Sequence, residues 1–348
     1  MSLTNADLET LVDTNDEWIV DRTGIRSRGI NHTQVTDMAE VAAHHALAAA
    51  GLEPTDIDLL ILATVTPEIT CPSNACELQR RLGAVNVAAF DLNAACSGFV
   101  YGAVTASSLI ATGVHDRVLV VGAEQLHWVM DYRDRNTCVL FGDGAGAAIF
   151  EVSERGDGML AADLGADGVA GSTMVFESLG TRRPLGEVRD PATSRLHFEG
   201  QAIFKHAVRG VADSVRKTLA LAGASVDDID VVVPHQANSR IIDAAMQRLG
   251  VDTDRVFLNI AEHGNTSAAS VPMALTDALN AGRIAPGALV VLTAFGGGLT
   301  WASAAYRWGE RTTPVASSEA ALADPTVTVF DVLAHNRAFF APLHDADG

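Results

Sequence analysis

Residues 90–113 read FDLNAACSGFVYGAVTASSLIATG, which predicts a strand, a short turn of small residues and a helix. The helix is apolar or small on almost every side, as is typical of a buried helix. Cys96 lies at or near its first residue, where backbone N–H groups lack helical partners and the helix dipole favours an anion. We therefore expect Cys96 to have a lowered pKa and to act as a nucleophile; the alternative is an inert buried cysteine.

Short apolar runs alternate with helical stretches on both sides of this segment. The strands that we expect are residues 59–64, 87–92, 117–123, 230–235, 255–260 and 288–295. The helices that we expect are residues 37–50, 74–82, 96–112, 199–222, 238–249 and 268–281. The strands are almost continuously apolar, as parallel strands covered on both faces are. This alternation indicates an α/β architecture built in layers.

The chain contains an internal repeat. IDLLILATVTPE, followed by a helix ending QRRLG, matches IDVVVPHQANSR, followed by a helix ending MQRLG. RVLVVGAE and FGDGAGAAIFE correspond in the same way to ALVVLTAFGGG and LTWASAAYR. We expect residues 1–155 and 156–311 to be two halves related by a pseudo-twofold axis, with residues 312–348 as a C-terminal extension. Chance similarity between strand–helix units is the alternative.

Composition excludes several classes of function. The chain is 48% hydrophobic with a formal net charge of −19, so neither nucleic acid nor an anionic membrane is an expected partner. It has no run of about 18 apolar residues and no basic-then-apolar leader, so we expect a cytoplasmic protein. Its four cysteines show no C-x-x-C spacing, so neither a metal site nor a redox dithiol is expected.

Three further stretches follow expected strands. His235 ends the strand at 230–235, Asn265 lies in the loop after residues 255–260, and three glycines at 296–298 follow residues 288–295. Open α/β sheets place their sites beyond the carboxyl ends of strands. The structural alternatives are a hydrogen-bonding histidine, a capping or turn asparagine, and a tight glycine turn. If the repeat is real, it would bring all three to one pocket with Cys96.

The motifs AACSGF, VPHQANSRII, HGNTSAASVP and AFGGGLTWAS together resemble those of β-ketoacyl-acyl-carrier-protein synthase III, a family of condensing enzymes in the thiolase superfamily. FGDGAGAA and TNADLETLVDTNDEWIVDRTGIRSR resemble family segments too, so the likeness runs from about residue 4 to 308. The resemblance implies a thiolase-like duplicated α/β fold with α-β-α-β-α layers.

The resemblance also implies a reaction. Cys96 would accept the acyl group of acyl-CoA as a thioester, and malonyl-acyl-carrier protein would then lose CO₂ and attack it. His235 and Asn265 would donate hydrogen bonds to the malonyl thioester oxygen, and the backbone N–H groups of Cys96 and Gly297 would form the oxyanion hole. Such a reaction begins fatty-acid or polyketide synthesis. Acyl-CoA is a substrate here, and no cofactor is expected.

The resemblance assigns further binding residues outside this centre. By position, Trp18, Arg22 and Arg135 match residues that contact CoA, and Arg240 and Arg248 match residues that dock the acidic carrier protein. The family works as a homodimer, and Cys71 matches a position that lines the partner's acyl pocket. A small residue there suggests room for a primer longer or more branched than acetyl.

Two departures from the family pattern stand out. Family members usually begin with a strand, expected to be central in the sheet, but only Met1-Ser2-Leu3 precedes the matching segment. A misplaced or truncated start is one explanation; another is that residues 326–332, which look strand-like, fill the empty place. The second departure is the tail, linker-like over residues 312–325 and about 40 residues longer than the usual family end.

Rival functions make different demands on the sequence. A papain-like hydrolase shares the order Cys, His, Asn but carries a C-G-S-C-W type context, which is missing here. A related acyltransferase or starter-unit loading enzyme would pass the acyl group to another acceptor. A non-catalytic acyl-CoA-binding protein is disfavoured because Cys96, His235 and Asn265 are all intact.

Overall fold

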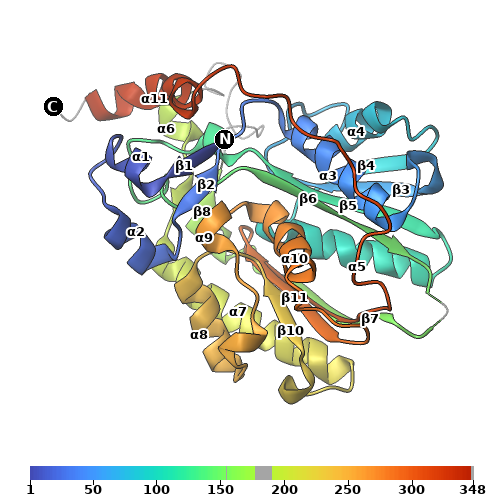
Figure 1. Cartoon of the computed structure of the whole chain (residues 1–348). Coiled ribbons are helices and arrows are strands. Elements are labelled where there is room, and N and C mark those ends of the chain that lie inside the picture. Colours follow the sequence, from blue (N-terminus) through green and yellow to red (C-terminus); the bar gives the residue numbers. More distant parts are fainter. Residues whose placement is uncertain (154, 177–189, 346–348) are drawn as a thin grey trace.

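Two four-stranded sheets form the core of the computed structural model, which describes residues 1–153, 155–176 and 190–345 (Figure 1). The first sheet has the order β4-β3-β5-β6, made of β3 (Leu59–Ala63), β4 (Ala88–Leu92), β5 (Arg117–Glu124) and β6 (Gly144–Glu151). The second has the order β10-β11-β12-β7, made of β7 (Gly158–Ala166), β10 (Val231–Pro234), β11 (Leu289–Gly296) and β12 (Thr300–Arg307). β4, β3 and β5 are parallel to one another and β10 is parallel to β11, whereas β6, β12 and β7 pair antiparallel with their neighbours.

Side chains alternate between the two faces of each strand, so each sheet packs against helices on both faces and five layers form. Side chains such as Leu59 and Ile61 face the middle layer, where α5 (Gly98–Ala111) and α10 (Ser270–Asn280) are packed between the sheets. Their neighbours Leu60 and Leu62 face the opposite way. The outer helices are α3 (Val35–Ala50) and α4 (Asn74–Leu82) on the first sheet, and α7 (Gly200–Leu221) and α8 (Ser239–Leu249) on the second. The predicted α-β-α-β-α fold is thereby confirmed.

Most expected elements form within two or three residues of their predicted bounds, and Gly51, Gly83 and Gly250 cap helices with φ of 70°, 69° and 88°. The strand expected at 255–260 was wrong. A 3-10 turn, η7 (Thr253–Arg255), and the short helix α9 (Ile260–His263) occupy its two ends. Only a single bridge between Val256 and Val232 remains. The apolar run is too short to extend the ladder between these two turns.

The matching strand orders reveal where the two sheets differ. In the second sheet β12 pairs with both β11 and β7. Its counterpart β6 pairs with β5, and no other strand of the described ranges pairs with it. The place equivalent to β7 is therefore at the edge beside β6, which corrects the expectation of a vacancy in the middle of the sheet. The halves 1–155 and 156–311 remain predictions, although the two sheets divide between β6 and β7.

The C-terminal tail is an ordered strap, not a strand. Residues 312–325 run along α3, with Val315 N–H donating to the Ala49 carbonyl at 3.0 Å (Figure 1). Residues 326–332, expected to be a strand, form a turn and the start of α11 (Val329–Asp345). Thr328 and Asp331 explain this, because each side chain accepts the other's backbone N–H, a capping box that starts a helix.

The helix α11 is attached at both ends to the body of the protein. Leu333 and Phe340 are fully buried, and Leu333 packs in a cluster with Leu3 and Leu8 near the amino terminus. His344 Nε2 lies 2.7 Å from Asp131 Oδ2, and Asn336 donates to the His127 carbonyl. The extension therefore belongs to the folded unit.

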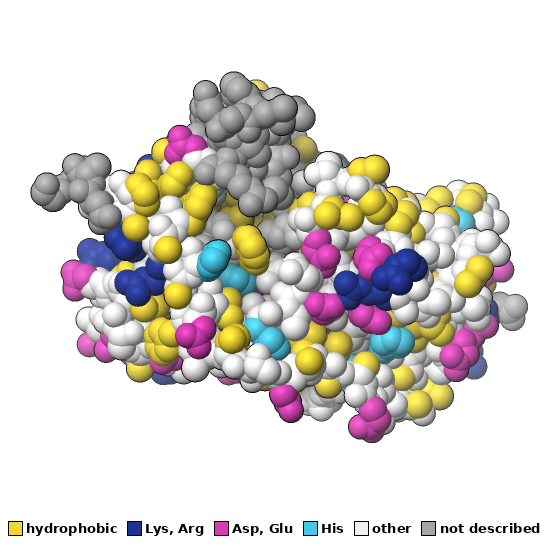
Figure 2. Space-filling model, turned by 90° about the horizontal axis from the view of Figure 1, so that it is seen from above, with side chains coloured by type: hydrophobic (Ala, Val, Ile, Leu, Met, Phe, Trp, Pro, Cys, Tyr) yellow, Lys and Arg dark blue, Asp and Glu magenta, His cyan; other side chains and the backbone are white. Residues whose placement is uncertain are grey.

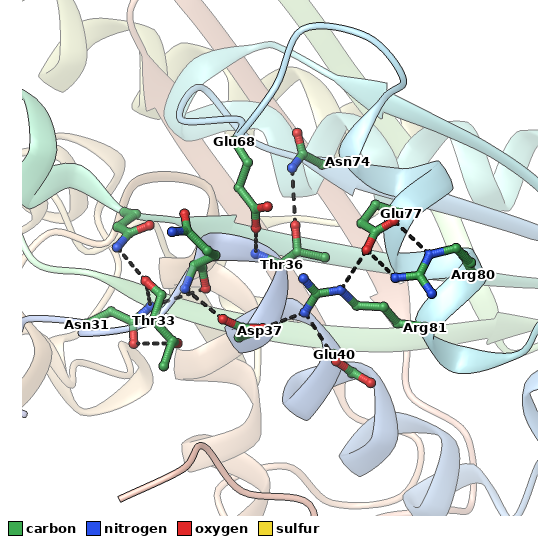
Figure 3. Close-up of polar contacts among 12 residues, drawn as sticks. Asn31, Thr33, Thr36, Asp37, Glu40, Glu68, Asn74, Glu77, Arg80 and Arg81 are labelled. Atoms are coloured by element: carbon green, nitrogen blue, oxygen red, sulfur yellow. Dashed lines mark hydrogen bonds and ion pairs between the residues drawn. The ribbon is translucent and has the colours of Figure 1, made fainter. Parts of the chain in front are cut away.

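Arg81 links α3 to α4 through three carboxylates (Figure 3). Its guanidinium contacts Asp37 and Glu40 of α3 and Glu77 of α4. Asn74, at the start of α4, donates to the Thr36 hydroxyl at 3.1 Å. These contacts fix the carboxyl end of the loop that carries Cys71.

The described surface carries its charge in mixed groups. On the face shown in Figure 2, basic side chains lie beside acidic ones. Among the described helices, none is long and apolar enough to cross a membrane.

Candidate active site

Cys96 lies in a strained turn between β4 and α5. This turn is the 3-10 segment η2 (Ala95–Ser97), and Ala95 adopts a φ of 48°, in the left-handed region that L residues rarely use. A sharp strand-to-helix turn of this kind presents a nucleophile at the end of a sheet. Gly296 faces the turn so closely that a Cβ there would lie 2.7 Å from Cys96 N. The thiol is therefore held on a strained backbone turn that Gly296 approaches closely.

Burial dominates the electrostatics of Cys96. It raises the pKa of the thiol to about 11, although the Ser267 hydroxyl and the backbone N–H groups of Cys96 and Gly297 lower it. The nearby Glu124 carboxylate adds to the increase. The expected lowering of this pKa was wrong, because desolvation of a thiolate outweighs the donors at the turn. The resting thiol is protonated at neutral pH.

His235 lies at the carboxyl end of β10 and is buried. Its Nδ1 is 2.6 Å from the Ser270 hydroxyl, which also receives the Gln236 N–H at 3.4 Å. Among the described residues, Nδ1 is the only hydrogen-bond acceptor found for the Ser270 hydroxyl, so we assign the hydroxyl hydrogen to Nδ1 and the ring hydrogen to Nε2. Burial lowers the His235 pKa to about 3, so the ring is neutral. A neutral ring with Nε2–H is a hydrogen-bond donor that carries no charge.

Asn265 is held by both its backbone and its side chain. Its N–H donates to the Leu140 carbonyl at 2.9 Å, and its carbonyl accepts the Gly142 N–H at 3.0 Å. Oδ1 accepts the Ser267 N–H at 2.9 Å. Because Oδ1 is engaged, Nδ2 is the atom left to donate to a ligand.

One cavity of about 540 Å³ joins these groups. Cys96, His235 and Asn265 all line it, together with Arg22 and Arg240. Most of the remaining wall is apolar, with contributions from Phe141, Met174, Phe198, Ile203, Phe204 and Phe295. The space and its lining suit an acyl chain carried on a thioester.

The residues expected to bind CoA, to dock the carrier protein or to reach the partner's acyl pocket differ in where they lie relative to this cavity. Trp18 on α2 (Asp16–Thr23) has the guanidinium carbons of Arg22 and Arg135 over its ring at 4.9 and 5.5 Å. Arg248 lies in the last turn of α8, outside the cavity wall, and its guanidinium is 3.8 Å from Asp213. Cys71 is exposed and does not line this cavity either.

Sequence reasoning missed three groups that contact the expected site residues. Ser270 contacts His235, Ser267 contacts both Cys96 and Asn265, and Glu124 contacts Ser267. Glu124 ends β5, so the rule that sites gather beyond strand ends could have found it. Ser267 and Ser270 carried no such signal, because serines near a helix start are usually caps.

A duplicated five-layer fold with a cysteine and a histidine at strand ends and an asparagine in the loop after α9 defines the class of thiolase-like condensing enzymes. Two family models match: 3-oxoacyl-[acyl-carrier-protein] synthase III over residues 90–168, and its C-terminal part over 219–308. The chain is 46% identical to the β-ketoacyl-[acyl-carrier-protein] synthase III of Desulfitobacterium hafniense, over 89% of this chain and 94% of that protein. This chain belongs to the 3-oxoacyl-[acyl-carrier-protein] synthase III family and is an acyltransferase of the condensing type.

Solved structures agree with this assignment. The synthase III of Aquifex aeolicus superposes with a TM-score of 0.83 at 44% identity, covering 88% of this chain and 96% of that one. The priming β-ketosynthase from the R1128 polyketide pathway superposes with a TM-score of 0.84 at 36% identity, covering 89% and 93%. The second likeness bears on the choice of pathway.

Proposed function

We propose that this enzyme condenses an acyl-CoA primer with malonyl-acyl-carrier protein and so initiates fatty-acid synthesis in the cytoplasm. The observation that carries the proposal is the convergence of Cys96, His235 and Asn265 on one largely apolar cavity. A buried thiol, a neutral histidine and an amide donor suit thioester exchange followed by stabilisation of an enolate.

In the first half-reaction Cys96 Sγ attacks the acyl-CoA carbonyl and the CoA thiolate leaves. The thiol loses its proton as the C–S bond forms, because its pKa of about 11 leaves little free thiolate. The backbone N–H groups of Cys96 and Gly297, which lower the pKa of the thiol, would stabilise the developing oxyanion.

In the second half-reaction malonyl-acyl-carrier protein loses CO₂ and the resulting enolate carbon attacks the acyl-Cys96 carbonyl. Negative charge develops on the malonyl thioester oxygen, where His235 Nε2–H and Asn265 Nδ2–H would both donate. A neutral His235 suits this task, because it stabilises the enolate oxygen without protonating it. Expulsion of the Cys96 thiolate frees the β-ketoacyl product.

Trp18, Arg22 and Arg135 form the proposed contact for the nucleotide of CoA. The Trp18 ring offers a stacking surface for adenine, and the two guanidinium groups over it offer charge to the phosphates. Arg22 also lines the cavity, so it continues this surface toward Cys96.

Arg240 and Arg248 at the two ends of α8 are the proposed docking residues for the acidic carrier protein. With a net charge of −19, the chain must steer an acidic partner through a local basic patch. Cys71 is proposed to reach the acyl pocket of a second copy in a homodimer. Its exposure and its distance from the cavity of its own chain are compatible with that role.

The decisive experiment is labelling with radioactive acyl-CoA primers of several lengths. Cys96 should become acylated, and Cys96→Ala should abolish the label; undiminished labelling of the alanine variant refutes the assignment. Release of CO₂ from malonyl-acyl-carrier protein then tests the condensation. If the acyl-enzyme forms without CO₂ release, the enzyme passes its acyl group to another acceptor.

A second candidate function is the loading of polyketide starter units. The likeness to the R1128 priming enzyme favours it. Both functions share the same chemistry, so the distinguishing measurement is the rate with carrier proteins of the two pathway types. A preference for a polyketide carrier protein would favour the second candidate.

A further inference from the structure

We propose that Glu124 and Ser267 form a proton relay that takes the Cys96 proton during acylation and returns it during condensation. The relay rests on the proposed function, since it supplies the proton transfers that the thiol requires there.

The Glu124 carboxylate is completely buried behind the nucleophile turn. Its Oε2 accepts the Thr66 hydroxyl at 2.7 Å, and both oxygens accept the Val65 N–H at 3.1 and 3.2 Å. Its Oε1 accepts the Ser267 hydroxyl at 3.0 Å. Within the described ranges, no lysine, arginine or histidine is among its hydrogen-bond partners. A buried carboxylate surrounded only by hydroxyl and N–H donors is a proton acceptor without a countercharge.

Ser267 connects this carboxylate to the thiol. Its hydroxyl donates to Glu124 Oε1 at 3.0 Å and is near enough to Cys96 to lower the pKa of the thiol, so it lies between the two groups. The Ser267 N–H is bonded to Asn265 Oδ1, which fixes the turn η8 (Ser267–Ala269). Ser267 has a φ of 49°, so this turn is strained as the Cys96 turn is. A strained backbone conformation persists only where the surrounding contacts enforce it, so the contacts around Ser267 hold this turn in place.

The proton steps balance as follows. When Sγ attacks the acyl-CoA carbonyl, the S–H proton passes to Ser267 Oγ while the Ser267 proton passes to Glu124 Oε1. The acyl-enzyme then coexists with a neutral Glu124, and the leaving CoA thiolate takes a proton from water. When condensation expels Cys96 as a thiolate, Glu124 returns its proton through Ser267. The single proton that the overall reaction consumes is the one on CoA.

The electrostatics are suited to this exchange. Burial raises the Glu124 pKa to about 7, which is near the operating pH where a proton carrier is most effective. The buried carboxylate gains the thiol proton during acylation, so the acyl-enzyme site is neutral, and it regains its charge when it returns the proton. His235 lines the same cavity but is neutral and bonded to Ser270, so it does not compete for this proton.

The test is the pH dependence of Cys96 alkylation by iodoacetamide, measured on the full chain between pH 5 and 9. This reaction needs the thiolate but neither acyl-CoA nor carrier protein. We expect the wild-type rate to rise through a step near pH 7, set by Glu124. Glu124→Gln and Ser267→Ala should each remove the step and lower the rate at pH 8 by roughly 10²-fold.

A matched control is Ser97→Ala, which removes a buried hydroxyl from the Cys96 turn itself. Ser97 is bonded to Thr300 and not to Glu124, so the step near pH 7 should remain. Ser267→Ala keeps the test usable if Glu124→Gln does not fold, because Ala95 already shows that alanine adopts this backbone conformation.

The outcomes separate the two proposals. A wild-type profile without the step, or a step retained in Ser267→Ala, overturns the relay, even if the variants melt at lower temperature. Failure of acyl-CoA to label Cys96, together with a Glu124-dependent alkylation profile, overturns the proposed function but leaves Glu124 and Ser267 as the groups that take the Cys96 proton.

Discussion

The Ser270 hydroxyl lies 2.6 Å from His235 Nδ1 and determines which ring nitrogen can donate to a ligand. Ser270 begins α10 and His235 directly follows β10, so a helix and a strand set the tautomer together. Without this contact either nitrogen could carry the hydrogen.

Ser270→Ala should slow decarboxylation of malonyl-acyl-carrier protein about 10-fold, less than the roughly 10²-fold typical of losing an oxyanion donor. Acylation of Cys96 should be unchanged, because His235 acts in the second half-reaction. Rates of CO₂ release and of acyl-CoA labelling measure the two separately. Equal losses in both would contradict the assigned tautomer.

Gly296→Ala should disable the nucleophile turn. The added Cβ would lie 2.7 Å from Cys96 N, so the turn must shift. A displacement of about 1 Å at a reacting group can cost roughly 10²-fold in rate, and we expect acyl labelling to fall by that amount. Gly168→Ala is the control, since no atom lies within 4 Å of its Cβ. An active Gly296→Ala enzyme would show that the turn adapts.

Trp18→Ala should raise the KM for acyl-CoA roughly 10-fold, because stacking on a base contributes about 1–3 kcal/mol. The kcat should change little. An acyl thioester of N-acetylcysteamine has no nucleotide, so its KM should stay the same. Trp128→Ala, at a tryptophan 61% exposed, is the matched control. An equal loss with both thioesters would place the defect in folding and not in CoA binding.

Phe340→Ala should destabilise the protein by about 3–5 kcal/mol, as is typical of a buried phenylalanine. Phe340 is 1% exposed, whereas its neighbour Phe339 is 36% exposed, so Phe339→Ala should cost much less. Urea unfolding midpoints for the two variants measure the difference. Similar midpoints would mean that α11 does not contribute to global stability.

Acid should destabilise the protein through His235. Its folded pKa of about 3 lies below the ordinary value of 6.5, so between these pH values the unfolded chain binds a proton that the folded chain does not. The stabilisation is complete above pH 6.5 and is lost as pH falls toward 3. His235→Gln removes this contribution, so the free energy of unfolding at pH 5 minus that at pH 8, measured with urea, should be more positive in the variant than in the wild type. Glu124 contributes in the opposite sense. Because its folded pKa of about 7 lies above the ordinary value of 4.5, its stabilisation is complete below pH 4.5 and is lost as the pH rises through 7.

Much of the architecture could be predicted from local patterns. Continuous apolar runs predicted β3, β5 and β11, and small residues beside Cys96 predicted the turn before a buried helix. The strand expected at 255–260 failed because flanking turns left only Val256 able to pair. The strand expected at 326–332 failed because Thr328 and Asp331 cap a helix instead.

By itself the sequence determined the alternation of strands and helices, the glycine caps, the place of Cys96 and His235 after strands and that of Asn265 in a loop. Tertiary structure alone decided the protonation of these groups, because a pKa depends on burial by segments from distant parts of the chain. Burial raises the pKa of Cys96, contrary to the prediction from its helix end, and holds His235 neutral. The contact between Ser267 and Glu124 joins residues 143 positions apart, and no local pattern could have indicated it.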